Sequence, residues 1–258
     1  MNKPLGHRVR VIGIFFACAL AIGPAAFMMA AEKNEARVTQ VVHDVRLIAP
    51  STAPRPASIN DNVRQGTAVQ TGSDSRAELA FADRTLARLG ANTVLSFEGG
   101  REFDLVSGSM LLYLPKSSES ERINTAVATA AGSSFTVMAE YRPKSWLKFI
   151  ILEGHGRVSL KHHPGETRAL RAGQMIMVLP GATKLPEPQD VDLPEVIKTS
   201  LLITKFPPLP NVKMILAEAN NQQASPPSSN VIDPTGINTR DQRAATERER
   251  TTKPRFDR

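Results

Sequence analysis

Hydrophobic and polar residues alternate with a period of two through much of residues 59–181. Ala77, Leu79 and Phe81 fall on one side of an extended segment, and the residues between them fall on the other. Because successive side chains of a strand point to opposite faces of a sheet, this pattern predicts a domain of half-buried β-strands. The same alternation recurs in three later segments: Phe135, Val137, Ala139 and Tyr141; Leu147, Phe149 and Ile151; Val158 and Leu160.

Turn residues divide this region into short strands. Residues 82–85 read as a tight turn between two strands of a hairpin, and residues 163–166 read as a turn that joins two later strands. A glycine closes each of four short motifs (RLG, VSG, LEG and RAG), with spacings of 18, 46 and 19 residues at Gly90, Gly108, Gly154 and Gly173. Two of the spacings suit one coil of a solenoid or one hairpin. We therefore expect an all-β fold of stacked strands, either roll-like or a sandwich.

The segments that flank residues 59–185 have other patterns. Residues 37–56 predict a first strand followed by a proline-rich loop. Residues 187–220 predict helices, because apolar residues recur near helical spacing and the strand pattern stops. Residues 221–258 are rich in Gln, Ser, Pro, Arg and Glu, with little to bury, and predict a disordered charged tail.

Residues 1–31 have the pattern of a membrane-targeting segment. Three basic residues precede 21 uncharged residues, and Ala30 and Ala31 follow Pro24 in the order typical of a cleaved signal peptide. An uncleaved membrane anchor is the alternative, because the uncharged run is long enough to cross a bilayer. Both interpretations place the rest of the chain outside the cytosol, in the periplasm or cell envelope, and only the anchor interpretation gives it a membrane contact.

Charge and cysteine content narrow the classes of partner and chemistry. The formal net charge of the whole chain is +7, and removal of the three leading cations leaves 29 basic against 25 acidic residues, or +4. This balance is too mild to indicate a nucleic-acid partner. The single cysteine, Cys18, lies inside the apolar leader. A processed chain would have no disulfide, thiol nucleophile or cysteine-ligated metal.

Six motifs resemble the FecR domain, the extracytoplasmic module of the iron-dicitrate regulator family. They are GTAVQTG at 66–72, SRAEL at 75–79, DRT at 83–85, RLG at 88–90, LEGHGRV at 152–158 and LRAGQ at 170–174. The resemblance covers about half of the chain and implies an all-β module that binds an envelope protein or transmits a signal to one. It does not imply an enzyme. Two features depart from the family: ten residues stand where those regulators have a cytoplasmic anti-sigma domain, and the chain ends in predicted helices and a tail.

No catalytic or metal-binding arrangement stands out in the sequence, and no cofactor is expected. His162 and His163 are adjacent in a turn, where neighbouring strand residues point to opposite faces, so they suit solvated histidines better than a metal site. No GxSxG motif is present. Carboxylate pairs such as Glu98 with Glu102 fall on turns or exposed strand faces, where solvation of the surface is the simpler role.

Two sets of residues are candidates for partner binding. Arg76, Arg84, Arg88 and Arg101 could form a basic strip if the hairpin and the RLG turn stack, although surface arginines often only keep edge strands soluble. Tyr141 and Trp146 flank a polar turn and could hold a partner or a sugar, although anchoring of the core is the commoner role of such aromatics.

The sequence thus favours a non-enzymatic, exported FecR-domain protein that binds an envelope protein partner or takes part in envelope signalling. A carbohydrate or cell-wall binding module, with a glycan as the partner, is the alternative. An enzyme is the interpretation with the least support, because no nucleophile, acid/base pair or metal set can be named.

Overall fold

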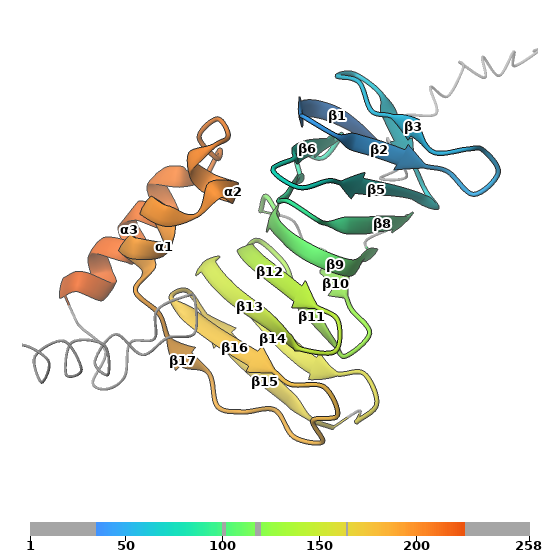
Figure 1. Cartoon of the computed structure of the whole chain (residues 1–258). Coiled ribbons are helices and arrows are strands. Elements are labelled where there is room, and N and C mark those ends of the chain that lie inside the picture. Colours follow the sequence, from blue (N-terminus) through green and yellow to red (C-terminus); the bar gives the residue numbers. More distant parts are fainter. Residues whose placement is uncertain (1–34, 100–101, 117–119, 164, 225–258) are drawn as a thin grey trace, which may run out of the picture. The chain divides into compact units, whose positions relative to one another are not determined.

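The computed structural model describes residues 35–99, 102–116, 120–163 and 165–224. In these residues strands dominate, and they form two β-sheets that pack face to face, with three helices on the outer face of one sheet (Figure 1). The sheet that carries the helices is called the helix-side sheet below, and the other is called the far sheet. The predicted all-β class with stacked strands and a short helical extension is confirmed.

Short antiparallel strands, each joined to its neighbours by hydrogen bonds, build the helix-side sheet. Its order is β4 (Asn62–Arg64), β1 (Glu35–Val42), β6 (Arg76–Phe81), β7 (Leu86–Leu89), the second half of β9 (Glu102–Tyr113), β12 (Thr136–Arg142), β13 (Trp146–Glu153), β16 (Gln174–Val178) and β17 (Gln189–Asp190).

The far sheet repeats this arrangement and shares the long strand β9. Its order is β3 (Arg55–Pro56), β2 (Val45–Ile48), β5 (Thr67–Thr71), β8 (Val94–Gly99), the first half of β9, β10 (Glu121–Asn124), β11 (Ala128–Gly132), β14 (His155–Leu160) and β15 (Thr167–Arg171). The β9–β10 pair is parallel and the other pairs of this sheet are antiparallel.

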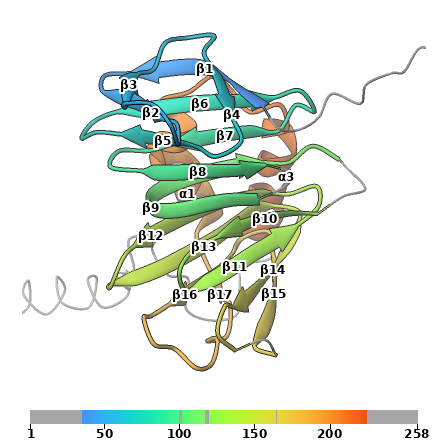
Figure 2. The same ribbon diagram turned by 90° about the vertical axis from the view of Figure 1, so that its right-hand side faces the viewer.

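The chain passes repeatedly from one sheet to the other, and the four repeated glycines mark these passages. Gly90 lies between β7 and β8, Gly154 between β13 and β14, and Gly173 between β15 and β16, while Gly108 lies inside β9 where that strand leaves the far sheet. Gly108 has a φ of +94°, a conformation that side-chain-bearing residues rarely adopt. The four repeated glycines therefore lie where the chain passes between the two sheets. The stacking of the strands within the sheets is visible in Figure 2.

The core fills the space between the two sheets. The inward positions of the alternating segments, among them Ala77, Leu79, Val137 and Phe149, are buried there as predicted. Phe81 packs edge to face on two aromatic rings of the far sheet, at centroid distances of 5.0 Å to Phe97 and 5.5 Å to Phe103. The predicted hairpin over residues 75–89 is also confirmed, since β6 and β7 pair across the turn at 82–85.

The three helices cover part of the outer face of the helix-side sheet. They are α1 (Leu193–Thr199), α2 (Leu201–Thr204) and α3 (Val212–Ala224), and α1 begins at Asp192, whose side chain accepts a hydrogen bond from the backbone N–H of Glu195. A second apolar cluster joins the helices to the sheet: Val196, Leu202, Ile215 and Ala219 pack with Leu111, Ile150, Leu152 and Met175. We refer to the three helices as the helical cap.

The structure differs from the sequence-based prediction at both flanks of the domain. Residues 37–56 contain most of β1 and all of β2 and β3, three sheet strands rather than one. His43 adopts a positive φ of 59°, and the chain turns there from β1 to β2. Helix α3 continues to Ala224, so the first residues of the predicted tail are helical. The predicted leader, residues 1–31, and the rest of the tail lie outside the described residues. In the part that is described, no helix has the length and hydrophobicity to cross a bilayer.

Candidate functional site

The outer face of the helix-side sheet is divided between a covered and an uncovered half. Because side chains alternate along a strand, β12 directs Met138, Glu140 and Arg142 outward, while the residues between them enter the core. Met138 packs against the helical cap, whereas Glu140 and Arg142 lie beyond its edge. On the neighbouring strand β13, Trp146 stands opposite Arg142. The boundary of the cap therefore coincides with a change from apolar to charged side chains.

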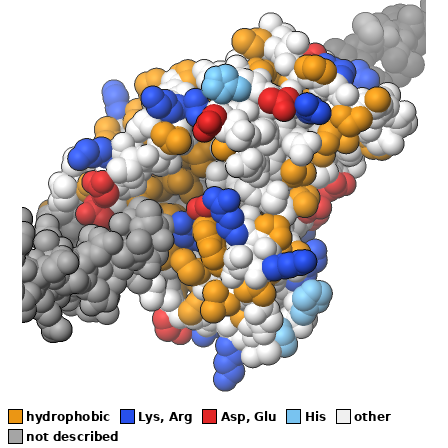
Figure 3. All heavy atoms as spheres, in the orientation of Figure 1, with side chains coloured by type: hydrophobic (Ala, Val, Ile, Leu, Met, Phe, Trp, Pro, Cys, Tyr) orange, Lys and Arg blue, Asp and Glu red, His pale blue; other side chains and the backbone are white. Residues whose placement is uncertain are grey.

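A groove follows this boundary. It consists of two adjoining cavities of about 320 and 310 Å³ that share Ser109, Met138, Glu140 and Ser200. Figure 3 shows a hollow on this side of the molecule, with hydrophobic side chains in it and basic and acidic ones at its margin. Other lining residues are Trp146, Lys148, Ile150, Val196 and Thr199 in the first cavity and Asp74, Arg76, Gly90, Ala91, Asn92, Arg142, Leu201 and Leu202 in the second.

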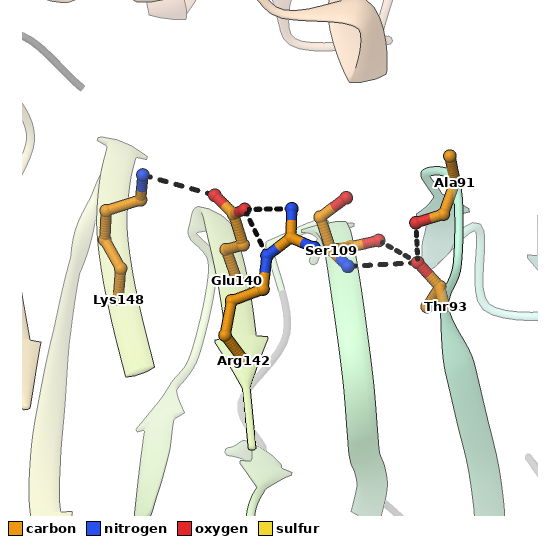
Figure 4. A network of polar contacts seen from close by, with 6 residues as sticks. All are labelled: Ala91, Thr93, Ser109, Glu140, Arg142 and Lys148. Atoms are coloured by element: carbon orange, nitrogen blue, oxygen red, sulfur yellow. Dashed lines mark hydrogen bonds and ion pairs between the residues drawn. The ribbon is translucent and has the colours of Figure 1, made fainter. Parts of the chain in front are cut away.

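Glu140 is held between two cations in this groove (Figure 4). It stands directly opposite Lys148 in the sheet register, and its Oε2 atom lies 3.2 Å from the Lys148 Nζ atom. Its Oε1 atom lies 3.1 Å from Nη2 of Arg142. The Lys148 ammonium also lies 5.0 Å from the centroid of the Trp146 ring, as a cation–π contact. These contacts hold the side chains of Glu140, Lys148 and Trp146 together in the first cavity.

The corner between β7 and β8 forms a wall of the second cavity. The Thr93 hydroxyl accepts a hydrogen bond from the backbone N–H of Ser109, at 3.0 Å, and lies 3.0 Å from the Ser109 carbonyl oxygen (Figure 4). The Gly90 backbone N–H donates a hydrogen bond to the Ser109 carbonyl oxygen at 2.9 Å, and a Cβ atom added at Gly90 would overlap the Ser109 Oγ atom. The wall is therefore a fixed part of the fold, set by glycine and by one buried hydroxyl.

Arg76 differs from the other cations of the groove because it has no partner among the described residues. Its side chain makes no hydrogen bond or ion pair with the described residues, and its Nε atom is shielded from solvent without an acceptor. Arg142 and Lys148 both pair with Glu140. Arg76 is one of the residues singled out from the sequence, and the structure places it in the groove.

The predicted basic strip does not form among the described residues. Arg88 is 1% exposed, because it points outward from β7 directly beneath the helical cap. Its Nε atom lies 2.8 Å from Glu78, and it donates hydrogen bonds to the carbonyl oxygens of Leu202 and Pro207 at 3.1 and 2.6 Å. Burial lowers the pKa of Arg88 and the Glu78 carboxylate opposes that shift. Arg84 is exposed at the tip of the hairpin turn, and Arg101 lies outside the described residues.

The two aromatic candidates separate in the same way. Tyr141 is 6% exposed and belongs to the core between the sheets. It lies on the same inward face of β12 as Val137 and Ala139, so it is not available to a partner. Trp146 is half-buried and lines the first cavity of the groove. Of the residues predicted to bind a partner, the structure brings Arg76 and Trp146 to one surface.

A second buried polar contact joins the helical cap to the sheet. Asn211, just before α3, donates hydrogen bonds from Nδ2 to the Thr136 hydroxyl, at 2.7 Å, and to the Glu153 carboxylate, at 3.0 Å. Burial raises the pKa of Glu153, and nearby Glu218 raises it further, while the hydrogen bond from Asn211 opposes the shift. This contact is structural, since neither cavity of the groove includes Glu153.

The histidines stand apart from the groove. His155, His162 and His163 are exposed on the far-sheet side, and the His43 Nδ1 atom lies 2.9 Å from the backbone carbonyl of Asp74. Within the described ranges, no three His, Cys, Asp or Glu side chains come together as a metal site would require.

Sequence reasoning missed Glu140, Arg142 and Lys148 as parts of a site. The signal was present, because they occupy the outward positions of the alternating strands whose inward positions were recognised. Their grouping depends on the strand register and on where the helical cap ends, and neither can be obtained from one sequence.

The fold and the groove define an all-β module with a lateral groove. Comparison with family models makes the assignment more specific: residues 67–155 match the family described as FecR protein. The family suggested by the six motifs is thereby confirmed. The matched segment spans β5 to the start of β14 and includes Arg76, Glu140 and Trp146, whereas the helical cap lies beyond it.

Solved structures give weaker likenesses. Two crystal structures of a candidate anti-sigma factor from Parabacteroides distasonis are 12% identical to this chain, with TM-scores of 0.43 and 0.42. The matches cover 48% and 61% of this chain, and 59% and 91% of those chains. The first match thus spans less than two thirds of the length of its counterpart. The search among curated proteins gives no significant match.

Proposed function

We propose that this chain is an exported, non-enzymatic FecR-domain protein that binds a protein partner in the cell envelope and takes part in signalling there. The observation that carries the proposal is the groove at the edge of the helical cap, which lies mainly on the FecR segment and gathers Arg76 and Trp146 from the predicted binding residues. The leader-like pattern of residues 1–31 supports the location.

A binding role suits the groove better than catalysis. Its ionisable side chains are satisfied by one another, as in the set formed by Glu140, Arg142 and Lys148, or stand alone, as Arg76 does. A general acid or base needs a pKa adjusted to its task. Among the described groups whose pKa is shifted, Glu153 and Arg88 lie under the cap, and Arg55 and Asp61 pair with each other outside the groove.

Glycan binding is the second candidate, and the half-buried ring of Trp146 is the observation that favours it. Sugars stack on an open aromatic face, but the Lys148 ammonium already lies over this ring. Retention on purified peptidoglycan that is lost in Trp146→Ala would support the glycan candidate over the protein partner.

The proposal can be tested by quantitative co-purification from bacterial envelopes. The tagged protein and its Trp146→Ala and Arg76→Ala variants would be compared with Arg157→Ala, which removes an exposed cation from the far sheet. We expect one set of envelope proteins to be recovered with the wild type and with Arg157→Ala, and to be depleted in both groove variants. Equal recovery with all four proteins would contradict the groove as the binding surface.

A further inference from the structure

Within the part of the chain that the structure describes, the groove contains one cation without a counter-charge. Its charged lining consists of two acidic side chains, Asp74 and Glu140, and three basic ones, Arg76, Arg142 and Lys148. Glu140 serves both Arg142 and Lys148, and no ion pair joins Arg76 to Asp74. The net charge of the lining is therefore +1, and the unsatisfied positive charge is located on Arg76.

The position of Arg76 makes this charge a recognition element rather than an ordinary surface cation. Its Nε atom is shielded from solvent and lacks an acceptor, which is an unfavourable state for a charged donor. An exposed arginine such as Arg84 is satisfied by water, whereas Arg76 would gain a hydrogen bond from any acceptor placed in the second cavity. A carboxylate fits best, because the planar guanidinium matches its two oxygens.

The remainder of the groove suits a peptide chain. Met138, Ile150 and Val196 give the first cavity an apolar lining that can receive a hydrophobic side chain. Hydroxyl groups of Ser109 and Ser200 lie where the two cavities meet, within reach of a backbone that crosses from one to the other. In an extended peptide, alternate side chains point the same way, so an acidic and an apolar residue two positions apart can enter the two cavities together.

We infer that the groove binds an extended segment of a partner protein in which an acidic side chain pairs with Arg76 and a nearby apolar side chain enters the cavity beside Trp146. The inference rests on the proposed protein-binding function and specifies the chemistry of the partner. A lipid surface fits less well, because membrane recognition uses clusters of four or more cations and the groove leaves one unpaired.

Selection from a random nine-residue peptide library displayed on phage tests this inference. The purified full chain should enrich peptides with Asp or Glu two positions from an aliphatic or aromatic residue. Synthetic versions of the selected peptides should bind Arg76→Ala at least tenfold more weakly and Arg157→Ala within twofold of the wild type. The circular dichroism and thermal melting of each variant would be recorded to confirm its fold.

A charge-reversal variant, Arg76→Glu, keeps the test decisive if Arg76→Ala folds less well than the wild type. Arg76→Glu should select basic peptides in place of acidic ones, an outcome that loss of folding does not produce. Enrichment of neutral or basic peptides by the wild type would overturn the inference and leave the protein-binding function standing. Absence of any enriched peptide, together with retention on a glycan array or on anionic vesicles that Trp146→Ala abolishes, would overturn both.

Discussion

Arg88 and Glu78 form an ion pair that is buried beneath helix α2. The guanidinium also contacts two backbone carbonyls of the cap and lies 4.9 Å from the centroid of the Phe206 ring. The donors of Arg88 therefore face the sheet or the cap. Glu78 lies on the neighbouring strand, whereas Leu202 and Pro207 are 114 and 119 residues further along the chain than Arg88. Two residues of the FecR motifs, in SRAEL and RLG, thus anchor a part of the chain that lies beyond the FecR segment.

Arg88→Ala should destabilise the protein strongly, because it removes the counter-charge of the buried Glu78 carboxylate, which keeps only the Thr39 hydroxyl as a donor among the described residues. It also removes the Arg88 donors from two carbonyl oxygens of the cap. Removal of one member of a buried pair costs about 3–5 kcal/mol. Urea unfolding should show a loss of this size. Arg84→Ala, which removes an exposed arginine from the same hairpin, is the control and should change the free energy of unfolding by less than about 0.5 kcal/mol. A loss below about 1 kcal/mol in Arg88→Ala would show that the cap does not depend on this residue.

Glu153 should make the stability depend on pH. Burial raises its pKa in the folded state above the unfolded value, so its favourable contribution is present below the unfolded pKa and is lost as the pH rises through the folded pKa. Glu153→Gln removes this charge and keeps an acceptor for Asn211. The free energy of unfolding of the variant, relative to the wild type, should increase with pH, by about 1.4 kcal/mol for each unit by which the two pKa values differ.

Urea titrations of both proteins between pH 4 and pH 8 at fixed ionic strength measure this difference. Glu218 also acts on Glu153 and is present in both proteins, so the comparison removes most of its contribution. A difference that stays constant across the range, or decreases as the pH rises, would contradict the assignment of a raised pKa to Glu153.

At the scale of the elements, the corners between the two sheets determine the stacking. Gly108 combines a φ of +94° with close packing, since a Cβ atom there would lie 2.4 Å from the Cα atom of Thr93. Gly154 shows the same combination, with 2.5 Å to the Ser134 carbonyl oxygen. In both cases the obstacle is backbone, which cannot move away without disturbing the neighbouring corner.

Gly108→Ala should therefore destabilise the protein by about 1–3 kcal/mol from backbone strain alone, with steric overlap adding to the loss. Gly165→Ala provides a matched control, because a Cβ atom at that exposed turn meets nothing within 4 Å. Thermal unfolding followed by circular dichroism should show a clear decrease in Tm for the first variant and little change for the second. Similar Tm values for the two variants would contradict the role given to the corner.

The elements themselves could be predicted from the sequence to a large extent. Alternation identified the inward residues of β6, β12, β13 and β14, and the change to helical spacing identified the cap. The two sheets and their shared strand β9 could not be predicted, because strand pairing joins residues far apart in the chain. The alternation of hydrophobic and polar residues does not indicate which strands are neighbours.

The candidate site was less predictable than the fold. Arg76 and Arg88 occupy equivalent outward positions in the sequence pattern, yet one lines the groove and the other is buried. The difference depends on where α2 rests on the sheet, a property of tertiary packing alone. Tyr141 is the opposite case, since its place in the inward series with Val137 and Ala139 already favoured the core.

At the scale of the whole molecule, a helical cap extends a β-domain in which residues 67–155 match the FecR family. The cap covers the apolar half of one sheet and forms one side of a groove whose other side is the charged half. The proposed binding surface is therefore formed jointly by the segment that matches the family and by a segment outside the match. Leu201 on α2 is 55% exposed and lines the groove, so it would lie close to a bound partner.

Site-specific photocrosslinking in intact envelopes tests the central claim most directly. A photoreactive residue would be placed at position 201 in the groove and, as the control, at position 157 on the far sheet. The account predicts a discrete adduct with one protein from position 201, absent from position 157, abolished by Arg76→Glu, and mapping by mass spectrometry to a segment that contains an acidic residue. Equal adducts from both positions, or an adduct at position 201 that Arg76→Glu leaves unchanged, would contradict it.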